Sequence, residues 1–562
     1  MPIGFLEALR LYPAAVGRTL ARQAAAEWMG TPPHRLSLQR PRPTGQACAP
    51  HDFRPPDPIG GAAILAGAFD LTGTKMVVGP RGDPWERASP SRRFAVALHR
   101  FDWLPGLLSQ GEEGAREAAR LAEGWRRAFG GWNAFAWSPE ALERRVFNLA
   151  CGLDALSRAA PTQAQGFRES LAAQARALLA AARTPARPAE RAIAAAVAGA
   201  ALDFGPRDDL LGGALKRLSV GLKRSVLADG GHVSRSPEAA LELLFDLRTL
   251  NDALRQRGAT LPADVAETAE RLAAAVRFFT GPDGRLAAFQ GGEAASPELV
   301  AAALLPWSQV APAADLPQSG YHRLNARSLD LIVDAAAPAH GPAGVTAAAQ
   351  PAALELYAAG EPLFVGGGWS PEALAPPALR LSAAASTITV AGGSPGRPLT
   401  GRLSRALGPR LTGAPRRVTS TLKREGRAAW LEVCHDGWTS GPGVRHERRL
   451  FVDATGDDLR GEDAVVPRGG PKSPVEVAVR FHLPRGVEAT VARDGRSVLL
   501  RTPGGKGWRL RSDAAEHRVE ASARVLDRRP HRTSQVVLKS IVRPSLGARI
   551  RWKLSPAAED DR

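Results

Sequence analysis

The feature that most constrains the fold is a change in the spacing of apolar residues near Ser319. Before this point apolar side chains recur every three or four positions, as on one face of an α-helix. After it they alternate with polar ones, as in a half-buried strand. The chain has 562 residues, whereas a single core stops growing at about 250–300 residues. The sequence therefore predicts two large domains of different class.

The helical domain is predicted to span residues 96–315. Leu121, Trp125 and Phe129 repeat at a helical spacing, and Ser236-Pro237 has the residue types of an N-cap and a first helical position. Many helices with short loops, and without strands between them, indicate an antiparallel helical array or toroid. The clearest helical stretches are residues 163–183, 187–203, 208–227, 237–256 and 262–279.

Residues 316–562 are predicted to form an antiparallel β-sandwich. The apolar residues from Val475 to Leu483 alternate with Glu476, Ala478, Arg480 and His482, which is the period of a strand. Asp494-Gly495 separates two strands as a hairpin turn would. Other predicted strands are Leu329–Val333, Ser386–Val390, Ala428–His435 and Val444–Val452.

Residues 1–95 are expected to be a lead-in to the helical domain. A basic amphipathic helix from Phe5 to Met29 is predicted to pack on its own protein, and contact with a membrane surface is the less favoured alternative. The proline-rich residues 31–95 are expected to be extended, with short strands at Ala63–Leu65 and Lys75–Val78.

No secretion signal or membrane span is recognised in the sequence. The short apolar stretch near the start is bracketed by Arg10 and Arg18 and contains Pro13, which does not resemble a signal peptide. The alanine-rich apolar stretch Ala192–Leu202 is too short to cross a bilayer. We therefore expect a protein without a transmembrane segment.

The net charge of +18 comes mainly from arginine, since only 8 of the 74 basic residues are lysine. Arginine binds carboxylate, sulfate and phosphate with two parallel donors, so an acidic polymer is one explanation, and a compositional bias toward alanine, glycine, proline and arginine is the other. No run of five basic residues occurs, and no basic stretch of the sequence interleaves with aromatics. Nucleic acid is therefore a disfavoured partner.

The cysteines and histidines do not predict a metal or cofactor site. Cys48, Cys151 and Cys434 lie far apart in the sequence and form no CxxC pair, which excludes a thiolate zinc site and a disulfide framework. Free thiols are expected, and no cofactor is predicted.

Eight local stretches of the chain form a distinctive series. In order they are Phe101–Leu104, Trp137–Leu149, Asp229–Pro237 (DGGHVSRSP), Asp283–Gly291, Ser319–Leu324 (SGYHRL), His435–Gly437, Arg445–Asp463 and Arg480–Leu483 (RFHL). Together they resemble the heparinase II/III family of polysaccharide lyases. This resemblance implies an incomplete (α/α) toroid followed by a C-terminal β-sandwich.

The resemblance also implies a chemistry, the β-elimination of a uronate-containing polysaccharide. An Asn or His neutralises the carboxylate, and Tyr and His remove and donate the protons. The family's tyrosine stands two residues beyond the proline of the DGGHVSRSP stretch, where this chain has Ala239. Its histidine precedes a segment that keeps Glu355, and the matching position is near Ala348. The usual active site is therefore not visible, and the alanine-rich segment offers no zinc ligands.

The resemblance leaves His232 and Arg235 as candidates at the mouth of the toroid. Arg235 would hold a substrate carboxylate, and His232 would act as the base near neutral pH. The alternative is that His232 caps or packs the loop while Asp229-Gly230 makes its turn.

Candidate groups from the sandwich are Tyr321, His435, His446 and His482, one of which would act across the cleft. Arg480 lies two residues before His482 and therefore on the same strand face, where it is a candidate for substrate binding. A hydrogen-bonded polar face is the alternative for the histidines, and packing at the domain interface is the alternative for Tyr321.

Two functions follow from the sequence. The first, which the family resemblance makes the main prediction and the loop with His232 and Arg235 supports, is a lyase that acts on an acidic polysaccharide with a rearranged site. The second is a catalytically degenerate relative that binds an acidic glycan or has a structural role, which the alanines at positions 239 and 348 favour. The resemblance implies the cell envelope or periplasm, and the lack of a recognised signal favours the cytoplasm.

Overall fold

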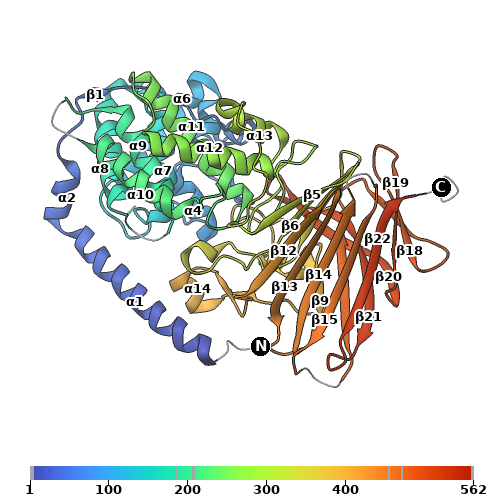
Figure 1. The fold of residues 1–562 in the computed structure, drawn as a ribbon. Helices are drawn as coiled ribbons and strands as arrows, with labels where there is room; N and C mark the ends of the chain where they lie inside the picture. Colours follow the sequence, from blue (N-terminus) through green and yellow to red (C-terminus); the bar gives the residue numbers. More distant parts are fainter. Residues whose placement is uncertain are drawn as a thin grey trace.

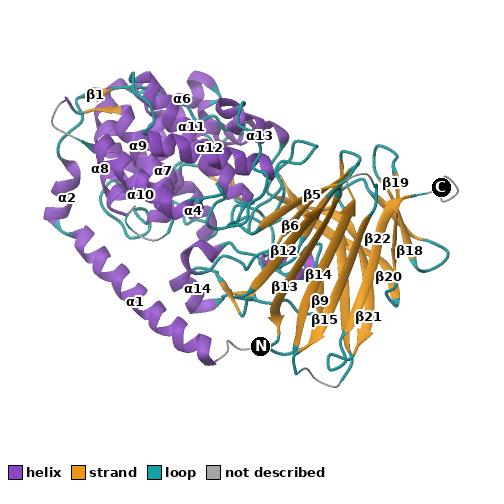
Figure 2. Cartoon of the chain, viewed as in Figure 1, coloured by secondary structure: helices purple, strands orange, loops and turns teal. Residues whose placement is uncertain are grey.

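The structure, a computed structural model, describes residues 5–181, 183, 186–205, 209–453, 456–469 and 473–557, and of residues 5 and 6 it describes the backbone alone. Helices dominate the N-terminal part and antiparallel sheets the C-terminal part, and the two lie side by side (Figure 1, Figure 2). The predicted fold class, a helical toroid-like domain followed by a β-sandwich, is confirmed.

The helices of the N-terminal part run back and forth with short connections. They are α1 (Phe5–Gly30), α2 (Pro32–Gln39), α3 (Pro58–Leu65), α4 (Arg92–Arg100), α5 (Leu104–Leu108), α6 (Gly111–Phe129), α7 (Pro139–Ala159), α8 (Ala164–Ala181), α9 (Pro188–Ala201), α10 (Leu210–Ser225), α11 (Pro237–Gln256), α12 (Ala263–Phe278) and α13 (Pro297–Leu304).

Helix α9 forms the centre of this array. Every residue from Pro188 to Ala201 is buried, and the helix contacts α7, α8, α10 and α11. Apart from Glu190 and Arg191 the helix is apolar on every side, as is typical of a fully buried helix. Its many alanines let the neighbouring helices approach closely. At Gly221 of α10 an added Cβ would lie 2.9 Å from the backbone nitrogen of Ala189.

The strands of the C-terminal part form antiparallel sheets. An eight-stranded sheet has the order β12-β13-β14-β15-β22-β19-β18-β17, and two four-stranded sheets have the orders β20-β21-β16-β9 and β5-β6-β7-β8. These strands are β5 (Tyr321–Asn325), β6 (Leu329–Asp334), β7 (Leu354–Ala358), β8 (Glu361–Phe364), β9 (Ile388–Val390), β12 (Val418–Glu425), β13 (Ala428–Trp438), β14 (Val444–Asp453), β15 (Leu459–Pro467), β16 (Val475–His482), β17 (Glu488–Val491), β18 (Ser497–Arg501), β19 (Gly507–Ser512), β20 (Glu516–Leu526), β21 (Arg529–Val542) and β22 (Ala548–Pro556).

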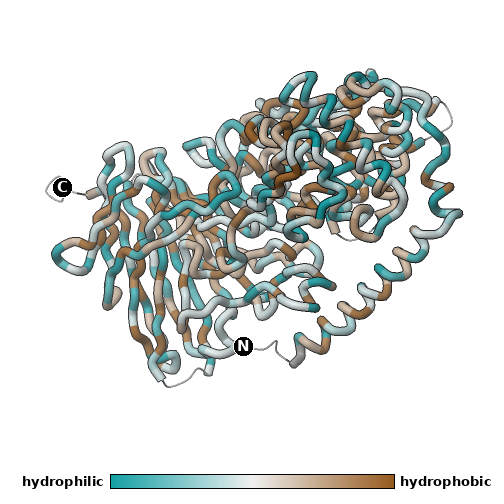
Figure 3. Tube along the Cα trace, turned by 180° about the vertical axis from the view of Figure 1, so that it is seen from behind, coloured by the Kyte–Doolittle hydropathy of each residue, from teal (hydrophilic) through white to brown (hydrophobic). Residues whose placement is uncertain are grey.

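The apolar core of the sandwich lies on one face of the eight-stranded sheet. Along β14, for example, Leu450 and Val452 are buried in this core while Arg449 and Phe451 point to the other face. Apolar and polar residues accordingly alternate along the strands (Figure 3). The alternation leaves the opposite face of the sheet with charged and aromatic side chains.

Short paired strands complete the fold. They are β1 (Gly45–Gln46) with β4 (Leu202–Asp203), β2 (Ala68–Leu71) with β3 (Thr74–Val77), and β10 (Arg397–Pro398) with β11 (Leu411–Thr412). A short helix, α14 (Gly401–Leu407), lies between β10 and β11.

The expectation for the proline-rich lead-in was partly wrong. Ala63–Leu65 belongs to helix α3 and not to a strand, because Asp57 caps the helix by accepting the N–H of Gly60 at 2.9 Å and Pro58 occupies its first position. The second expected strand is present as β3.

Helix α1 extends away from the helical body toward the sandwich (Figure 1). It packs on the protein along one side, where Ala15 and Leu11 contact Leu403 and Leu407 of α14. No helix among the described residues is long and apolar enough to cross a membrane. The exposed side of α1 carries the apolar side chains Leu9, Tyr12, Val16, Leu20 and Trp28.

Candidate functional site at the domain junction

The loop of residues 229–237 lies where the helical domain meets the sandwich. Asp229 accepts hydrogen bonds from the backbone N–H and the hydroxyl of Ser319, both at 2.7 Å. Gly230 has a φ of +88°, and an added Cβ there would lie 2.1 Å from the carbonyl oxygen of Arg271. The Asp229-Gly230 turn therefore fixes the loop against the first residues of the sandwich.

His232 is buried within this loop. Its Nδ1 lies 2.6 Å from the Ser234 hydroxyl and accepts the Ser234 N–H at 3.2 Å, which places the proton on Nε2. The Nε2 atom lies 3.6 Å from Glu190 of helix α9. Although burial opposes it, Arg187 and His232 hold the pKa of Glu190 below its usual value. The imidazole thus faces the centre of the helical domain.

Arg235 is also buried, and its donors are engaged by the sandwich. Its Nε donates to the carbonyl of Ser319, Nη1 to those of Ala336 and Ala337, and Nη2 to that of Gly320 and to the Asp334 carboxylate. All five N–H groups of the guanidinium are used, so none remains for a substrate carboxylate in this conformation. Arg235 fastens the two domains together.

Asp334 links Arg235, through Gln290, to Ala348, the position where the resemblance implies the family's histidine. Gln290 donates from Nε2 to Asp334 at 2.6 Å, and its Oε1 accepts the N–H of Ala348 at 3.1 Å. Arg235 and Gln290 have φ values of +65° and +48°, a region that is strained for residues other than glycine. Their contacts with Asp334 hold both in place.

Ala239, where the family has its tyrosine, stands in the first turn of α11, next to Glu238. The Glu238 carboxylate accepts the N–H of Glu293 at 3.3 Å, and the Glu293 carboxylate accepts the N–H of Arg528 at 2.8 Å. Burial and the Glu293 and Glu242 charges raise the pKa of Glu238 well above its usual range, and burial raises the pKa of Glu293. A group of buried carboxyls therefore lies at the start of α11.

Sequence reasoning missed this acidic group, which we call the junction carboxylates. Each of them interacts electrostatically with Arg528, at the tip of the hairpin between β20 and β21. Arg100 pairs with Glu372 at 2.9 Å and with Asp102 at 3.4 Å. No local pattern marks the group, because its members come from distant parts of the chain. The junction carboxylates are Asp102, Glu238, Glu242, Glu293 and Glu372.

Tyr321 is fully buried beside Arg235. Its hydroxyl donates to the carbonyl of Arg235 at 2.7 Å, and its ring packs edge-on against Phe279 at 4.8 Å. Burial, with the Asp334 charge, raises the pKa of Tyr321 well above its usual range. The structure thus brings Tyr321 and Arg235 together as part of the domain interface.

His435 and His446 lie together inside the sandwich. His435 Nδ1 accepts the N–H of Gly437 at 3.2 Å, so its Nε2 donates to His446 Nδ1 at 3.1 Å. His446 Nε2 then donates to Asp463 at 2.8 Å. Burial lowers the pKa of both histidines, so two neutral rings complete this chain of hydrogen bonds.

His482 and Arg480 share a face of β16, as the spacing predicts. His482 is buried with Nδ1 at 2.6 Å from the Ser522 hydroxyl, and Arg480 donates to Gln535 at 3.2 Å and lies 3.6 Å from Glu520. These two residues belong to the four-stranded sheet, whereas His435 and His446 belong to the eight-stranded one. No bond between described residues joins either pair to His232.

The described part of the chain contains no group of three His, Cys, Asp or Glu side chains arranged to hold a metal ion.

Residues 308–553 match the family described as heparinase II/III-like, C-terminal. The chain belongs to the heparinase II/III family. Among its relatives, FtsZ-localized protein C of Caulobacter vibrioides is 47% identical over 553 residues, which cover 97% of this chain and 96% of that protein.

Two solved structures of polysaccharide lyases share the fold of this heparinase II/III family member. The crystal structure of heparinase III has a TM-score of 0.70 at 14% identity and covers 96% of this chain and 89% of that one. Heparan sulfate lyase HepC from Pedobacter heparinus has a TM-score of 0.58 at 15% identity, with the same coverage of 96% and 89%. Likeness at these identities concerns the fold alone.

Proposed function

We propose that this chain is a non-catalytic member of the heparinase II/III family, which acts by binding a partner molecule and not by cleaving a polysaccharide. We also propose that it localises with FtsZ. The observation that carries the first part is the pair Ala239 and Ala348. At the two positions where the family resemblance requires a tyrosine and a histidine, this chain has methyl groups, which neither remove nor donate a proton. The relative named FtsZ-localized protein C supports the second part.

The charge at the junction also supports a role without β-elimination. A uronate polymer needs cations to bind it and to neutralise its carboxylate. The guanidinium of Arg235 donates all five of its N–H groups to the sandwich, so it offers none to a substrate carboxylate in this conformation. The cation that the sequence suggested for neutralising a uronate is therefore not free to do so.

Ultraviolet absorbance of the unsaturated uronate product tests the absence of catalysis. The purified full chain, incubated with heparan sulfate, chondroitin sulfate, hyaluronate and alginate, should give no absorbance increase above buffer, whereas heparinase III should give one. Unsaturated product from any of these polymers would overturn the proposal. It would favour the alternative, a lyase that uses His232, Arg235 and a group from the sandwich.

Localisation has a separate test. A fluorescent fusion of the full chain, produced in cells that carry a second label on FtsZ, should follow the FtsZ signal through the division cycle. Depletion of FtsZ should disperse it. A fusion that stays uniformly distributed, or that keeps its position after FtsZ is depleted, would refute this part of the proposal while leaving the absence of catalysis untouched.

A further inference from the structure

The outer face of the eight-stranded sheet carries a broad hollow of about 1180 Å³. Its lining comes from β12, β13, β14, β15, β22 and β19, together with the turn at Gly495 and the segment 512–515. This face points away from the sandwich core, because the buried residues of the same strands, such as Leu450 and Leu554, occupy the other side. Two rows of side chains cross it from strand to strand.

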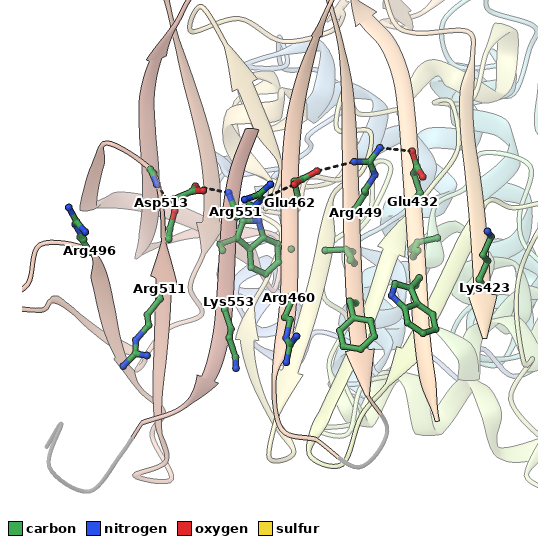
Figure 4. A pocket seen from close by; sticks show the side chains of 18 of the residues that line it. Lys423, Glu432, Arg449, Arg460, Glu462, Arg496, Arg511, Asp513, Arg551 and Lys553 are labelled. Atoms are coloured by element: carbon green, nitrogen blue, oxygen red, sulfur yellow. Dashed lines mark hydrogen bonds and ion pairs between the residues drawn. The ribbon is translucent and has the colours of Figure 1, made fainter. Parts of the chain in front are cut away.

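The first row consists mainly of paired charges. Arg449 pairs with Glu462 at 2.9 Å and with Glu432 at 3.4 Å, and Arg551 pairs with Glu462 at 3.1 Å. Asp513 accepts the backbone N–H of Arg551 at 2.7 Å. Figure 4 shows these groups joined in a continuous line. Since both arginines are engaged by glutamates and Asp513 adds a further carboxylate, this row has little capacity to attract an acidic molecule.

The second row, two residues further along the strands, is not balanced; we call it the cationic row. The strand register places its six members directly opposite one another on six neighbouring strands. Directly opposed residues point to the same face of a sheet. The cationic row consists of Lys423, Trp430, Phe451, Arg460, Lys553 and Arg511.

The charges of the cationic row are exposed and weakly compensated. The side chains of Arg460 and Lys553 are 60% and 46% exposed, and both pair with Asp458, at 2.8 and 3.3 Å. No ion pair is described for Lys423 or Arg511 with the residues that the structure places around them. Of the four cations, only Arg460 and Lys553 therefore have a described carboxylate partner, which is Asp458. Figure 4 shows Arg460, Lys553 and Arg511 lying beside the first row.

The aromatic members form an apolar patch within the row, between Lys423 and Arg460. The rings of Trp430 and Phe451 are 5.0 Å apart and tilted by 47°, and Trp430 is 40% exposed. The guanidinium of Arg460 covers one side of Phe451 at 5.5 Å. An exposed aromatic surface of this kind packs well against an aliphatic or aromatic side chain.

We propose that the cationic row is a docking site for an extended acidic polypeptide segment that carries one large apolar side chain. The acidic residues bind Arg460, Lys553 and Arg511, and the apolar residue packs on the exposed surface of the Trp430–Phe451 pair. Six strands at about 4.8 Å spacing make a row of about 24 Å, which an extended segment of about seven residues spans. This inference names a partner class for the binding role proposed above and rests on it.

Fluorescence anisotropy with the full chain tests the docking site. The probe is a fluorescein-labelled peptide of about ten residues, glutamates and aspartates around one phenylalanine. It should bind with a salt-dependent affinity, whereas a peptide with glutamine and asparagine in place of the acids should not. Replacing the phenylalanine by serine, or Trp430→Ala in the protein, should each weaken binding by about threefold or more.

A matched pair of variants on strand β22 distinguishes the row from general attraction. Lys553→Glu should weaken peptide binding by at least about tenfold. Arg549→Glu, the same change of charge on the same face of the same strand but outside the row, should leave it within about twofold. Asp458→Asn should strengthen binding, because it removes the carboxylate that competes for Arg460 and Lys553. Equal weakening by both charge reversals would overturn the proposal.

A parallel binding experiment with heparin distinguishes an acidic glycan from an acidic peptide as the ligand. If heparin binds with the same dependence on Lys553 while the acidic peptide does not bind, the site is a glycan site and the proposal is wrong. If the peptide binds but the ultraviolet assay detects unsaturated product, the docking site stands and the proposed absence of catalysis falls. If the peptide does not bind and no unsaturated product forms, the docking site is wrong and the proposed absence of catalysis stands.

Discussion

Arg235 and Asp334 form a buried ion pair that joins the helical domain to the sandwich. Their side chains are 6% and 1% exposed, and Asp334 accepts a second hydrogen bond from Gln290 at 2.6 Å. The loop that was expected to present Arg235 to a substrate therefore holds the two domains in register. The first prediction concerns this pair.

Arg235→Ala should lower the free energy of unfolding by about 3–5 kcal/mol, because it leaves the Asp334 charge buried without its partner. Urea denaturation of the full chain measures the change. Arg92→Ala is the control: Arg92 pairs with Glu140 at 2.9 Å on the surface, where both side chains are more than half exposed, and its loss should cost below about 1 kcal/mol. Equal stability of the Arg235 variant and the wild type would contradict the fastening role.

The second prediction concerns pH and His482. Burial, with Arg480 nearby, lowers the pKa of His482 to about 4 from an ordinary value of 6.5. Between these values the unfolded chain binds a proton that the folded chain does not, so stability falls as the pH falls from 6.5 toward 4. Over that interval His482→Gln should lose about 3 kcal/mol less than the wild type. Denaturation at a series of pH values measures it, and an unaltered slope would count against the neutral buried imidazole.

The third prediction concerns Arg528 and the junction carboxylates. Removing the cation in Arg528→Ala increases repulsion among the carboxylates and raises their pKa values further. Because protonation relieves this repulsion, the variant should be destabilised more near pH 7 than near pH 5. The measured quantity is the loss of unfolding free energy relative to wild type at the two pH values. Arg529→Ala, one residue along the same exposed turn, should show no such difference. A pH-independent loss would indicate a packing effect.

The fourth prediction concerns restoring the family's residues. Ala348 is 3% exposed, so Ala348→His forces an imidazole into a filled site and should cost about 1–3 kcal/mol of stability. Ala239→Tyr, on the partly exposed first turn of α11, should be tolerated with a smaller loss. Neither the single variants nor the double variant should produce unsaturated uronate, because all the donors of Arg235 remain engaged by the sandwich. Product from the double variant would show that only two side chains separate this chain from a lyase.

The helices were predictable because their signals are local. The expected stretches 237–256 and 262–279 match α11 (Pro237–Gln256) and α12 (Ala263–Phe278) within a residue at each end. Ser236 caps α11 by accepting the N–H of Ala239 at 3.3 Å, as its Ser-Pro start indicates. The error at Ala63–Leu65 has the same origin: three apolar residues fit either a strand or a helix, and the Asp57 cap was not recognised.

The site residues were not predictable in the same way. Five candidate side chains are chemically suited to proton transfer: His232, Tyr321, His435, His446 and His482. The sequence pattern does not indicate whether each of these side chains is exposed. In the structure all five are buried, with polar partners such as Ser234 and Asp463. Their catalytic roles stay predictions that require a change of conformation, and the assays above test them.

The sequence by itself determined the class and order of the two domains, because hydrophobic periodicity and helix caps depend on neighbours in the chain. It also shows alanine at positions 239 and 348, where the family resemblance implies a tyrosine and a histidine. Only the tertiary structure decided that Arg235 forms a buried ion pair with Asp334. It also decided that Lys423, Arg460 and Lys553 lie in one row across the sheet. Strand pairing brings together residues far apart in sequence, so the sequence contains no basic stripe interleaved with aromatics although the folded sheet has one.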